Sequence, residues 1–365
     1  MTSRPSVGLA CFSTFGGSGV VAAEIAMSLA RRGRRVHVFS DDPPGRLAAR
    51  RDGVTFHRVD APAYPQLRHD LYTLALASKI IEVARRDGLD VVHAHYALPH
   101  AVSAQLARRV LAAQPGARAP LVVTTLHGTD TTLVGIDPGF LPLTRFSVLD
   151  SDAVTVPSAW LAEATRRNLD LPAAAIDVIP NFVDTTRFAP APPTPGGVPV
   201  LVHVSNFRAL KRTDDVVRIF ARVRAGRAAR LRLVGDGPEH ARALTLAREL
   251  GVAADVDAVG ERDDLPALLA DAAAFLLPSE NESFGLAALE ALACGVPEVV
   301  RDGEVGFLHD VGDVAAMAAS TARLLDDPAL RARLGRAARA HAEAHFRVEP
   351  AVDRYEAVYA RVLAT

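Results

Sequence analysis

Short apolar runs alternate along the whole chain with longer stretches in which apolar residues recur at helical spacing. The short runs suit strands that are buried on both faces, and the stretches between them suit amphipathic helices. Strands joined by helices predict parallel sheets with helices on both faces, which is an α/β fold. The predicted strands are Val7–Phe12, Val36–Ser40, Val91–His95, Leu121–Leu126, Val200–Val204, Leu231–Val234 and Ala274–Leu277.

One change of composition divides this pattern into two halves. Residues 188–197 read Phe-Ala-Pro-Ala-Pro-Pro-Thr-Pro-Gly-Gly, which is typical of a connector, and a new strand follows. We therefore predict a first domain over residues 1–187, a linker over 188–197, a second domain over 198–346 and a terminal helical segment over 347–365. Both domains should be doubly wound and face one another, with ligands at the carboxyl ends of the strands.

Bulk properties narrow the classes of function. The 365 residues carry a net charge of −1, which gives no electrostatic basis for binding nucleic acid or an acidic membrane. The amino terminus has no signal-peptide pattern, and no apolar run approaches the roughly 20 residues that span a bilayer. We therefore expect a cytoplasmic protein without a membrane anchor. Cys11 and Cys294, the two cysteines, lie in apolar segments and exclude a disulfide framework or a cysteine-rich metal site.

The most informative segment is 278–297, Pro-Ser-Glu-Asn-Glu-Ser-Phe-Gly-Leu-Ala-Ala-Leu-Glu-Ala-Leu-Ala-Cys-Gly-Val-Pro. It follows a predicted strand, and residues 284–293 predict a helix. Glu282 then lies in the preceding loop, and Glu290 lies about two turns into the helix, among alanines and leucines. Free N–H groups at the helix start form an anion site between these carboxylates. This layout fits a nucleotide sugar, with a solvated acidic helix as the alternative.

A glycine-rich loop, Gly-Gly-Ser-Gly at 16–19, follows the first predicted strand and opens a helix. Gly17, Gly19 and Ala22 satisfy the dinucleotide-binding pattern, and two aspartates end the next strand. The first half alone is therefore also compatible with an NAD-dependent dehydrogenase. Such an enzyme does not need the glutamate and phosphate site of the other half, which favours the nucleotide-sugar hypothesis.

Four histidines lie near predicted strand ends, in the segments 90–100 and 124–130. Imidazole is a common zinc ligand, so a zinc site is one alternative. His93 and His95 share a face of one strand, but the sequence fixes no acidic or cysteine ligand beside them. Polar contact with sugar hydroxyls or a small anion is the other alternative, and His127 is the favoured candidate for it.

Several of these segments resemble one family. The segment 278–297 resembles the carboxyl-terminal signature of the retaining GT-B glycosyltransferases of family four. Leu-His-Gly-Thr-Asp at 126–130 and Asn-Phe-Arg-Ala-Leu-Lys-Arg at 206–212 resemble the subfamily that opens bacillithiol biosynthesis. The resemblance covers nearly the whole chain. The further segments that carry it are Phe15–Glu24, Leu76–Ile80, Val92–Val102 and Pro180–Asp184.

This resemblance implies two facing Rossmann-like domains with a nucleotide-sugar cleft between them, and a last helix that crosses back to the first domain. It implies transfer of N-acetylglucosamine from UDP-N-acetylglucosamine to the hydroxyl of L-malate, with retention and by front-face attack. No cofactor and no divalent metal are expected, so protein cations have to neutralise the departing diphosphate. A related transferase that acts on inositol phosphate shares the architecture and remains an alternative.

The resemblance also assigns roles on the donor side. Lys211 and Arg208 match the basic pair of the family, although an ordinary basic turn is the alternative. Asn206 stands where many relatives have arginine, which leaves Arg208 to supply the second charge. The implied catalytic residues are His127, Glu282, Lys211 and Arg208. The implied donor-binding residues are Gly16, Gly17, Asn206, Arg208, Lys211, Glu282, Ser283, Phe284, Gly285, Leu286 and Glu290.

The acceptor side needs cations because malate carries two carboxylates. Lys79 interrupts an otherwise apolar helix, and Arg145 lies on a later predicted helix. A solvated helix face is the alternative for each. The acceptor-binding residues that the resemblance implies are Gly17, Ser18, Lys79, Tyr96, Thr129 and Arg145. The expected partners are these two small-molecule substrates, with a homodimer left open. A non-catalytic nucleotide-sugar-binding protein is a third alternative, which the presence of both glutamates disfavours.

The chain departs from the family after Pro297. Relatives continue with a further strand and a Gly-Gly-containing loop before Glu-Val-Val, whereas Glu298 follows here directly. Loss of a central strand from a parallel sheet should be destabilising. We therefore expect a further segment at this point, with the Cα atoms of Pro297 and Glu298 much further apart than the ~3.8 Å of a trans peptide.

Overall fold

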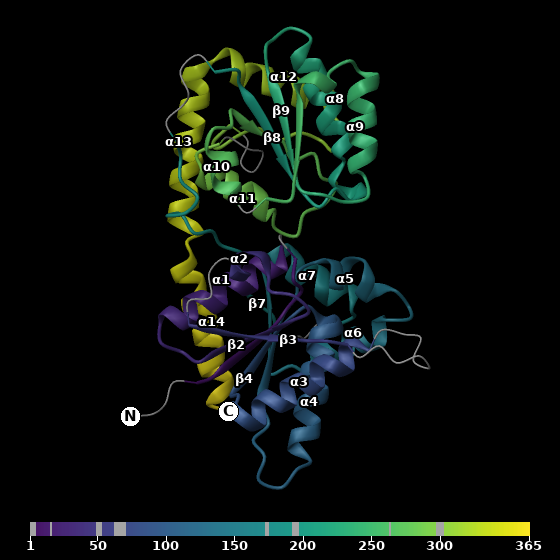
Figure 1. Ribbon diagram of the computed structural model, residues 1–365, viewed down its shortest axis with the longest axis vertical. Helices are drawn as coiled ribbons and strands as arrows, with labels where there is room; N and C mark the ends of the chain where they lie inside the picture. The colour runs from purple at the N-terminus through teal and green to yellow at the C-terminus, as the bar shows by residue number, and fades with distance from the viewer. Residues whose placement is uncertain are drawn as a thin grey trace. The chain divides into compact units, whose positions relative to one another are not determined.

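The computed structural model describes residues 5–14, 17–48, 53–61, 71–171, 175–191, 197–262, 264–296 and 303–365. The chain forms two compact units, of which unit 1 comprises Met1–Asn181 with Val348–Thr365 and unit 2 comprises Phe182–Arg347 (Figure 1). The division precedes the proline-rich segment because Val183 and Phe188 belong to the hydrophobic core of unit 2. Residues 192–196 of the predicted linker lie outside the described part of the chain.

Unit 1 contains a seven-stranded sheet with the order β3-β2-β1-β4-β5-β6-β7, in which every pair is parallel. The order reverses between β1 and β4, which marks the point where doubly wound sheets bind ligands. The first, second, fourth and fifth strands match the predicted runs to within two residues, whereas β3, β6 and β7 had not been predicted. The strands are β1 (Val7–Ala10), β2 (Val36–Ser40), β3 (Val54–Arg58), β4 (Val91–His95), β5 (Leu121–Thr125), β6 (Ala153–Val156) and β7 (Asp177–Val178).

Helices pack around this sheet, and the last helix of the chain is one of them. In α14, the Tyr359 hydroxyl lies 2.7 Å from His93 Nδ1 on β4. Arg32, the C-cap residue of α1, lies 2.6 Å from both Asp353 and Glu356 of α14. These contacts make α14 part of unit 1. The helices are α1 (Ser18–Arg31), α2 (Gly45–Ala48), α3 (Tyr72–Asp87), η1 (Ala97–Ala101), α4 (Val102–Ala112), α5 (Thr129–Thr132), η2 (Val134–Ile136), α6 (Leu141–Leu149), α7 (Ala159–Asn168) and α14 (Val348–Leu363).

Unit 2 repeats the same winding on a smaller scale. Its sheet has the order β10-β9-β8-β11, again parallel, and the order reverses between β8 and β11. The strands are β8 (Val200–Val204), β9 (Arg230–Val234), β10 (Val256–Gly260) and β11 (Ala274–Phe275). The helices are η3 (Ala209–Lys211), α8 (Thr213–Arg224), α9 (His240–Glu249), η4 (Ala253–Asp255), α10 (Leu265–Ala270), α11 (Leu286–Ala293), α12 (Val314–Asp326) and α13 (Pro328–His345).

The strand β11 is an edge strand of the sheet that the described residues form. A further strand beside it is what the family pattern led us to expect after Pro297. Both Pro297 and Glu298 lie outside the described residues, so the expected separation of their Cα atoms stays a prediction. Among the described residues, no helix is both long enough and apolar enough to cross a membrane.

Candidate functional site

The loops that follow β8 and β11 meet at the carboxyl ends of these two neighbouring strands in unit 2. The Glu280 N–H donates a hydrogen bond of 2.9 Å to the carbonyl of Leu210. Arg212 Nη1 lies 3.0 Å from Glu280 Oε1 and therefore ties the same two loops together. The strand order reverses between β8 and β11, so this junction is the position where such a sheet offers a ligand site.

An ion pair between Lys211 and Glu282 lies at this junction. Lys211 Nζ donates to Glu282 Oε1 over 2.5 Å, and the two side chains keep 18% and 24% of their surface exposed. Local backbone geometry explains the placement, because Lys211 ends the short helix η3 and Glu282 lies in the loop before α11. The structure thus brings together two of the predicted site residues and leaves the pair accessible to a substrate.

The helix α11 begins at this junction and carries the second predicted carboxylate. Its N-cap residue Gly285 has φ +82°, a backbone conformation that favours glycine. The first N–H groups of a helix have no intrahelical acceptor, so those around Leu286 form an anion site. Glu290 is only 3% exposed on this mostly apolar helix, and its charge adds to burial in raising the pKa of Cys294 to about 12. Ser283 and Phe284 are half-buried.

Two glycines that sequence reasoning missed hold the loop after β8. In the Val-Gly-Asp-Gly-Pro turn at 234–238, Gly235 and Gly237 have φ of +110° and +155°. A Cβ atom at Gly235 would lie 1.9 Å from the carbonyl oxygen of Ser205, and one at Gly237 would lie 2.0 Å from that of Asn206. The signal available in the sequence was the Gly-Asp-Gly-Pro turn itself, directly after a predicted strand.

Two predicted donor residues remain solvent-exposed beside this contact. Asn206 and Arg208 are both exposed and flank Phe207, which is fully buried with φ +40°. Among the described residues, no ion pair to Arg208 is found within 4.0 Å. Its exposed side chain is therefore accessible to an anion.

In unit 1 the corresponding junction lies between β1 and β4. The loop after β1 leads to Gly17, which has φ +58° and caps α1, and to Ser18, which is buried. A Cβ atom at Gly19 would lie 2.6 Å from the carbonyl oxygen of Thr14, so the loop folds tightly against the start of the helix. Gly16, another predicted donor residue, lies outside the described residues.

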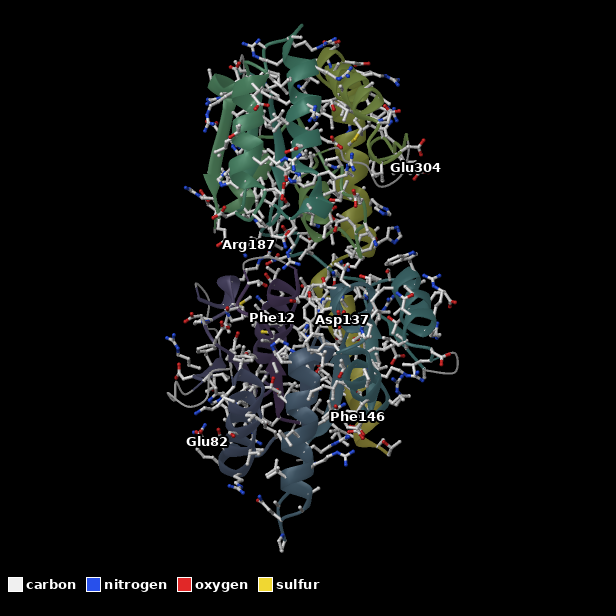
Figure 2. The ribbon with its side chains drawn as sticks, turned by 90° about the vertical axis from the view of Figure 1, so that its right-hand side faces the viewer. Phe12, Glu82, Asp137, Phe146, Arg187 and Glu304 are labelled. Carbon is white, nitrogen blue, oxygen red and sulfur yellow. The ribbon has the colours of Figure 1, made fainter. Side chains whose placement is uncertain are left out.

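Aromatic rings gather at the same junction. The half-buried Tyr96 has φ +88°, and its ring lies 5.2 Å from that of Phe12, which follows β1, and 5.1 Å from that of His127, which follows β5 (Phe12 is labelled in Figure 2). The structure therefore brings Tyr96 and His127 together. Thr129, the first residue of α5, is half-buried two residues beyond His127.

His127 is fixed by its neighbours. Its Nε2 lies 3.0 Å from Nδ1 of His95, and its N–H donates to Asp130 over 3.1 Å. Burial lowers the pKa of His127 to about 3, so the imidazole is neutral at neutral pH. Burial also raises the pKa of Asp130 to about 6, although backbone N–H groups that donate to its carboxylate oppose this shift. Since Nε2 faces His95, Nδ1 is the ring nitrogen left for a ligand.

Within the described part of the chain, the ligand nitrogens of these four histidines do not gather into a group that could hold a metal ion. Both ring nitrogens of His93 have partners, namely the Tyr359 hydroxyl at 2.7 Å and the Thr125 hydroxyl at 2.6 Å. The ring of His100 is fully buried and packs edge-on against Phe12. Both ring nitrogens of His93 are therefore engaged, and a ligand nitrogen must be free of other partners.

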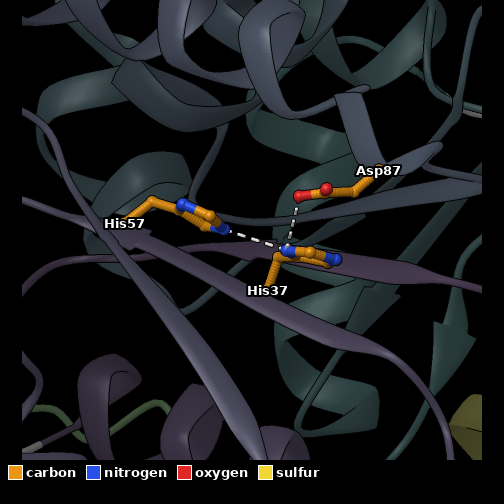
Figure 3. A group of neighbouring side chains, drawn as sticks. All are labelled: His37, His57 and Asp87. Atoms are coloured by element: carbon orange, nitrogen blue, oxygen red, sulfur yellow. Dashed lines mark hydrogen bonds and ion pairs between the residues drawn. The ribbon is translucent and has the colours of Figure 1, made fainter. Parts of the chain in front are cut away.

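A different group within the described residues has the ligand types of a cation site, namely His37, His57 and Asp87 (Figure 3). His37 Nδ1 lies 2.9 Å from His57 Nε2 and 3.9 Å from Asp87 Oδ2. Burial lowers the pKa of both histidines, to about 4 for His57. The Asp87 carboxylate already accepts hydrogen bonds from Arg86 on both oxygens. The group is therefore a hydrogen-bonded network in which the Asp87 carboxylate is already paired with the Arg86 guanidinium.

The two predicted acceptor cations each have a carboxylate partner. Lys79, in the middle of α3, lies 2.7 Å from Glu82 one turn further on. Its charge also lowers the pKa of His57, which places it near the pair of histidines on β2 and β3. Arg145 on α6 lies 3.6 Å from the carboxylate of Asp170 and donates to the Asp170 carbonyl over 3.3 Å. Binding an acceptor carboxylate would require either cation to exchange its partner.

Comparisons with known proteins identify the family. Residues 15–187 match the model of Glycosyltransferase Family 4, and residues 184–341 match that of Glycosyl transferases group 1. N-acetyl-alpha-D-glucosaminyl L-malate synthase of Bacillus anthracis is 40% identical over 98% of this chain and 97% of its own length. D-inositol 3-phosphate glycosyltransferase of Acidothermus cellulolyticus is 34% identical over 96% of this chain and 86% of its own.

Solved structures show the same fold. Sucrose-phosphate synthase from Thermosynechococcus elongatus superposes with a TM-score of 0.81 at 21% identity, over 99% of this chain and 100% of its own. Anabaena Alr3699/HepE, solved in complex with UDP and glucose, superposes with a TM-score of 0.77 at 18% identity, over 98% and 100%. The two parallel-sheet units, the matched families and the full-length relatives lead to one conclusion. The chain belongs to the GT-B glycosyltransferases that combine a family 4 amino-terminal domain with a group 1 carboxyl-terminal domain.

Proposed function

We propose that this glycosyltransferase transfers N-acetylglucosamine from UDP-N-acetylglucosamine to the hydroxyl of L-malate, the first step of bacillithiol biosynthesis. The observation that carries the proposal is the 40% identity, over 98% of the chain, to a protein named for that reaction. The inositol-phosphate transferase of Acidothermus cellulolyticus is less similar, at 34%. An inositol-phosphate acceptor is therefore the second candidate.

The donor nucleotide would lie on unit 2. In this proposal Glu290 accepts hydrogen bonds from the ribose hydroxyls, and the N–H groups at the start of α11 hold the diphosphate. Glu282 accepts from the sugar hydroxyls. Its existing pair with Lys211 at 2.5 Å supports this role, because the same carboxylate oxygen would hold the lysine close to the leaving phosphate.

The reaction would proceed with retention and without a divalent metal. The malate hydroxyl oxygen bonds to the anomeric carbon on the face from which UDP departs, and the bond from that carbon to the phosphate oxygen breaks. The departing phosphate oxygen takes the hydroxyl proton. Lys211 and the exposed Arg208 would neutralise the negative charge that develops on the diphosphate. No resident cofactor is required by this chemistry.

Unit 1 would supply the acceptor-binding groups. Neutral His127 and the Tyr96 hydroxyl provide hydrogen-bonding groups for the sugar and the acceptor, while Gly17 and Ser18 offer backbone at the start of α1. Lys79 and Arg145 would bind the malate carboxylates after exchanging Glu82 and Asp170 for the substrate. We also propose that the chain forms a homodimer.

The decisive experiment measures UDP release from UDP-N-acetylglucosamine with L-malate, inositol phosphate and other hydroxy acids as separate acceptors. We expect release with malate, unchanged by excess EDTA, and an α-linked product in the proton NMR spectrum. UDP release with inositol phosphate and not with malate would show that inositol phosphate is the acceptor. UDP-N-acetylglucosamine binding without product in the mass spectrum would support the non-catalytic alternative, and a melting-temperature increase with NAD alone would support the dehydrogenase.

A further inference from the structure

One surface of unit 1 is unusually apolar. Every exposed residue between Leu133 and Leu149 is apolar, glycine or proline, except Asp137. We call the large apolar side chains of this segment the α6 face; Phe146 and Asp137 are labelled in Figure 2. The α6 face consists of Leu133, Val134, Ile136, Phe140, Leu143, Phe146 and Leu149, which are 55%, 47%, 38%, 49%, 49%, 39% and 63% exposed.

The helix α6 carries apolar residues on its outer side as well as its inner side. Its buried side combines Val148, which belongs to a hydrophobic core cluster, with Thr144 and Ser147, both 0% exposed. These hydroxyls are satisfied within the helix, since Thr144 Oγ1 donates to the carbonyl of Phe140 and Ser147 Oγ to that of Thr144. A surface helix normally turns its apolar stripe inward and its polar residues outward. The packing of unit 1 therefore does not account for the apolar residues on the outer side of α6.

The neighbouring helix α4 extends this surface. Gln105 Nε2 donates to the Ser147 carbonyl over 2.7 Å and joins α4 to α6. The guanidinium of Arg109 lies 5.5 Å from the ring centroid of Phe146. On the same helix α4, Leu106 and Val110, which flank Arg109 in the helical sequence, are each 37% exposed. The apolar surface thus spans two packed helices and the turn before α6.

The size of this surface matches one side of a protein–protein interface. With roughly 150–200 Å² for a fully exposed large apolar residue, the nine side chains expose about 700 Å². The largest apolar patch of a typical monomer is about 300–600 Å², and one side of a standard interface buries about 800 Å².

The charges beside the α6 face disfavour an acidic membrane as its partner. Arg109 lies 3.3 Å from Asp150, and Arg145 lies 3.6 Å from Asp170. Attachment to acidic lipid relies on clusters of basic residues next to the apolar surface. Here each arginine at the edge is balanced by a carboxylate, as suits the rim of an interface between proteins.

We propose that the α6 face is the surface through which two copies of this chain associate. The two copies would present the same patch to each other around a twofold axis, the commonest arrangement of homo-oligomers. This inference rests on the homodimer included in the proposed function and identifies the residues that would form it.

The test is sedimentation velocity on the full chain at micromolar concentration. We expect the wild type to sediment as a dimer, at twice the monomer mass of 38.7 kDa. Leu143→Glu and Leu149→Lys should each sediment as monomers. Both changes suit the helix dipole, because Leu143 lies in the first turn of α6 and Leu149 in the last. Leu250→Glu, at a residue of unit 2 that is 41% exposed, is the matched control and should remain dimeric.

Circular dichroism and thermal melting of each variant separate loss of the dimer from loss of the fold. A monomeric wild type would overturn the proposal, and so would folded α6-face variants that remain dimeric. Co-sedimentation of the wild type with phosphatidylglycerol vesicles would also overturn it, in favour of a lipid surface. UDP release by the wild type is measured separately, so failure of the transferase assignment is distinguishable from failure of the interface.

Discussion

Replacing Gly235 with alanine should disrupt the loop that carries the basic residues of unit 2. Gly235 has φ +110°, and an added Cβ atom would lie 1.9 Å from the Ser205 carbonyl oxygen and 3.4 Å from the Phe207 ring. The backbone cannot easily shift, since the Gly235 N–H donates to the Gly260 carbonyl over 2.8 Å and the Ser205 N–H to that of Val234 over 3.1 Å. The loop after β8 would have to move instead.

Two costs add in this variant. Holding a non-glycine residue in a sparsely populated backbone region costs about 1–3 kcal/mol. Forcing an extra carbon into a closely packed site costs about another 1–3 kcal/mol. We therefore expect a loss of roughly 2–6 kcal/mol, which for a unit of this size corresponds to a fall in melting temperature of about 4–24 °C. UDP affinity should fall too, because Arg208 and Lys211 lie on the displaced loop.

Differential scanning calorimetry with two matched glycines separates the costs. Gly251 has φ +71° with nothing near its Cβ position, so Gly251→Ala should show the backbone cost alone. The Cβ position of Gly226 is open and no left-handed φ is involved, so Gly226→Ala should be close to neutral. If Gly235→Ala melts at the same temperature as Gly251→Ala, the inference that the two loops pack closely is wrong.

Four further predictions follow from the site and the buried histidines. Glu290→Ala should weaken UDP binding by about 1–3 kcal/mol in calorimetric titration; an unchanged dissociation constant would refute the ribose role. Glu282→Gln should reduce turnover more than it reduces UDP affinity, and equal losses would mean that the roles of the two glutamates are wrongly assigned. Alanine at Lys79 or Arg145 should raise the KM for malate and leave that for the donor nearly unchanged, so a donor defect would contradict their placement. His100, whose pKa burial lowers from 6.5 to about 4, contributes stability that is present above pH 6.5 and is lost as the pH falls through about 4. The loss of unfolding free energy between pH 7 and 4 should therefore be up to about 3 kcal/mol smaller in the His100→Phe variant than in the wild type, as measured from melting curves across that pH range.

The alternation of apolar runs and helical stretches was enough to predict the fold class. It located the strands at the centre of both sheets, because a strand buried on both faces is a continuous apolar run. It missed β3, β6, β7 and β10, whose burial is less uniform or whose runs are short. In β3, for example, Val54 is buried while Thr55 and Arg58 are exposed. Such a strand is defined by its pairing with a neighbour, and pairing between distant segments leaves no local pattern.

The sequence by itself determined the candidate site residues of unit 2, because Glu282 and Glu290 lie on one strand–loop–helix segment whose local geometry fixes their relation. Only the tertiary structure decided that Lys211 pairs with Glu282, since 70 intervening residues separate them and the parallel pairing of β8 with β11 brings their loops together. The same holds for Gly235, whose tight contact with Ser205 depends on two strands lying side by side. It also holds for the α6 face. The sequence predicts a helix at α6, but the packing of unit 1 around this helix decides which side is buried.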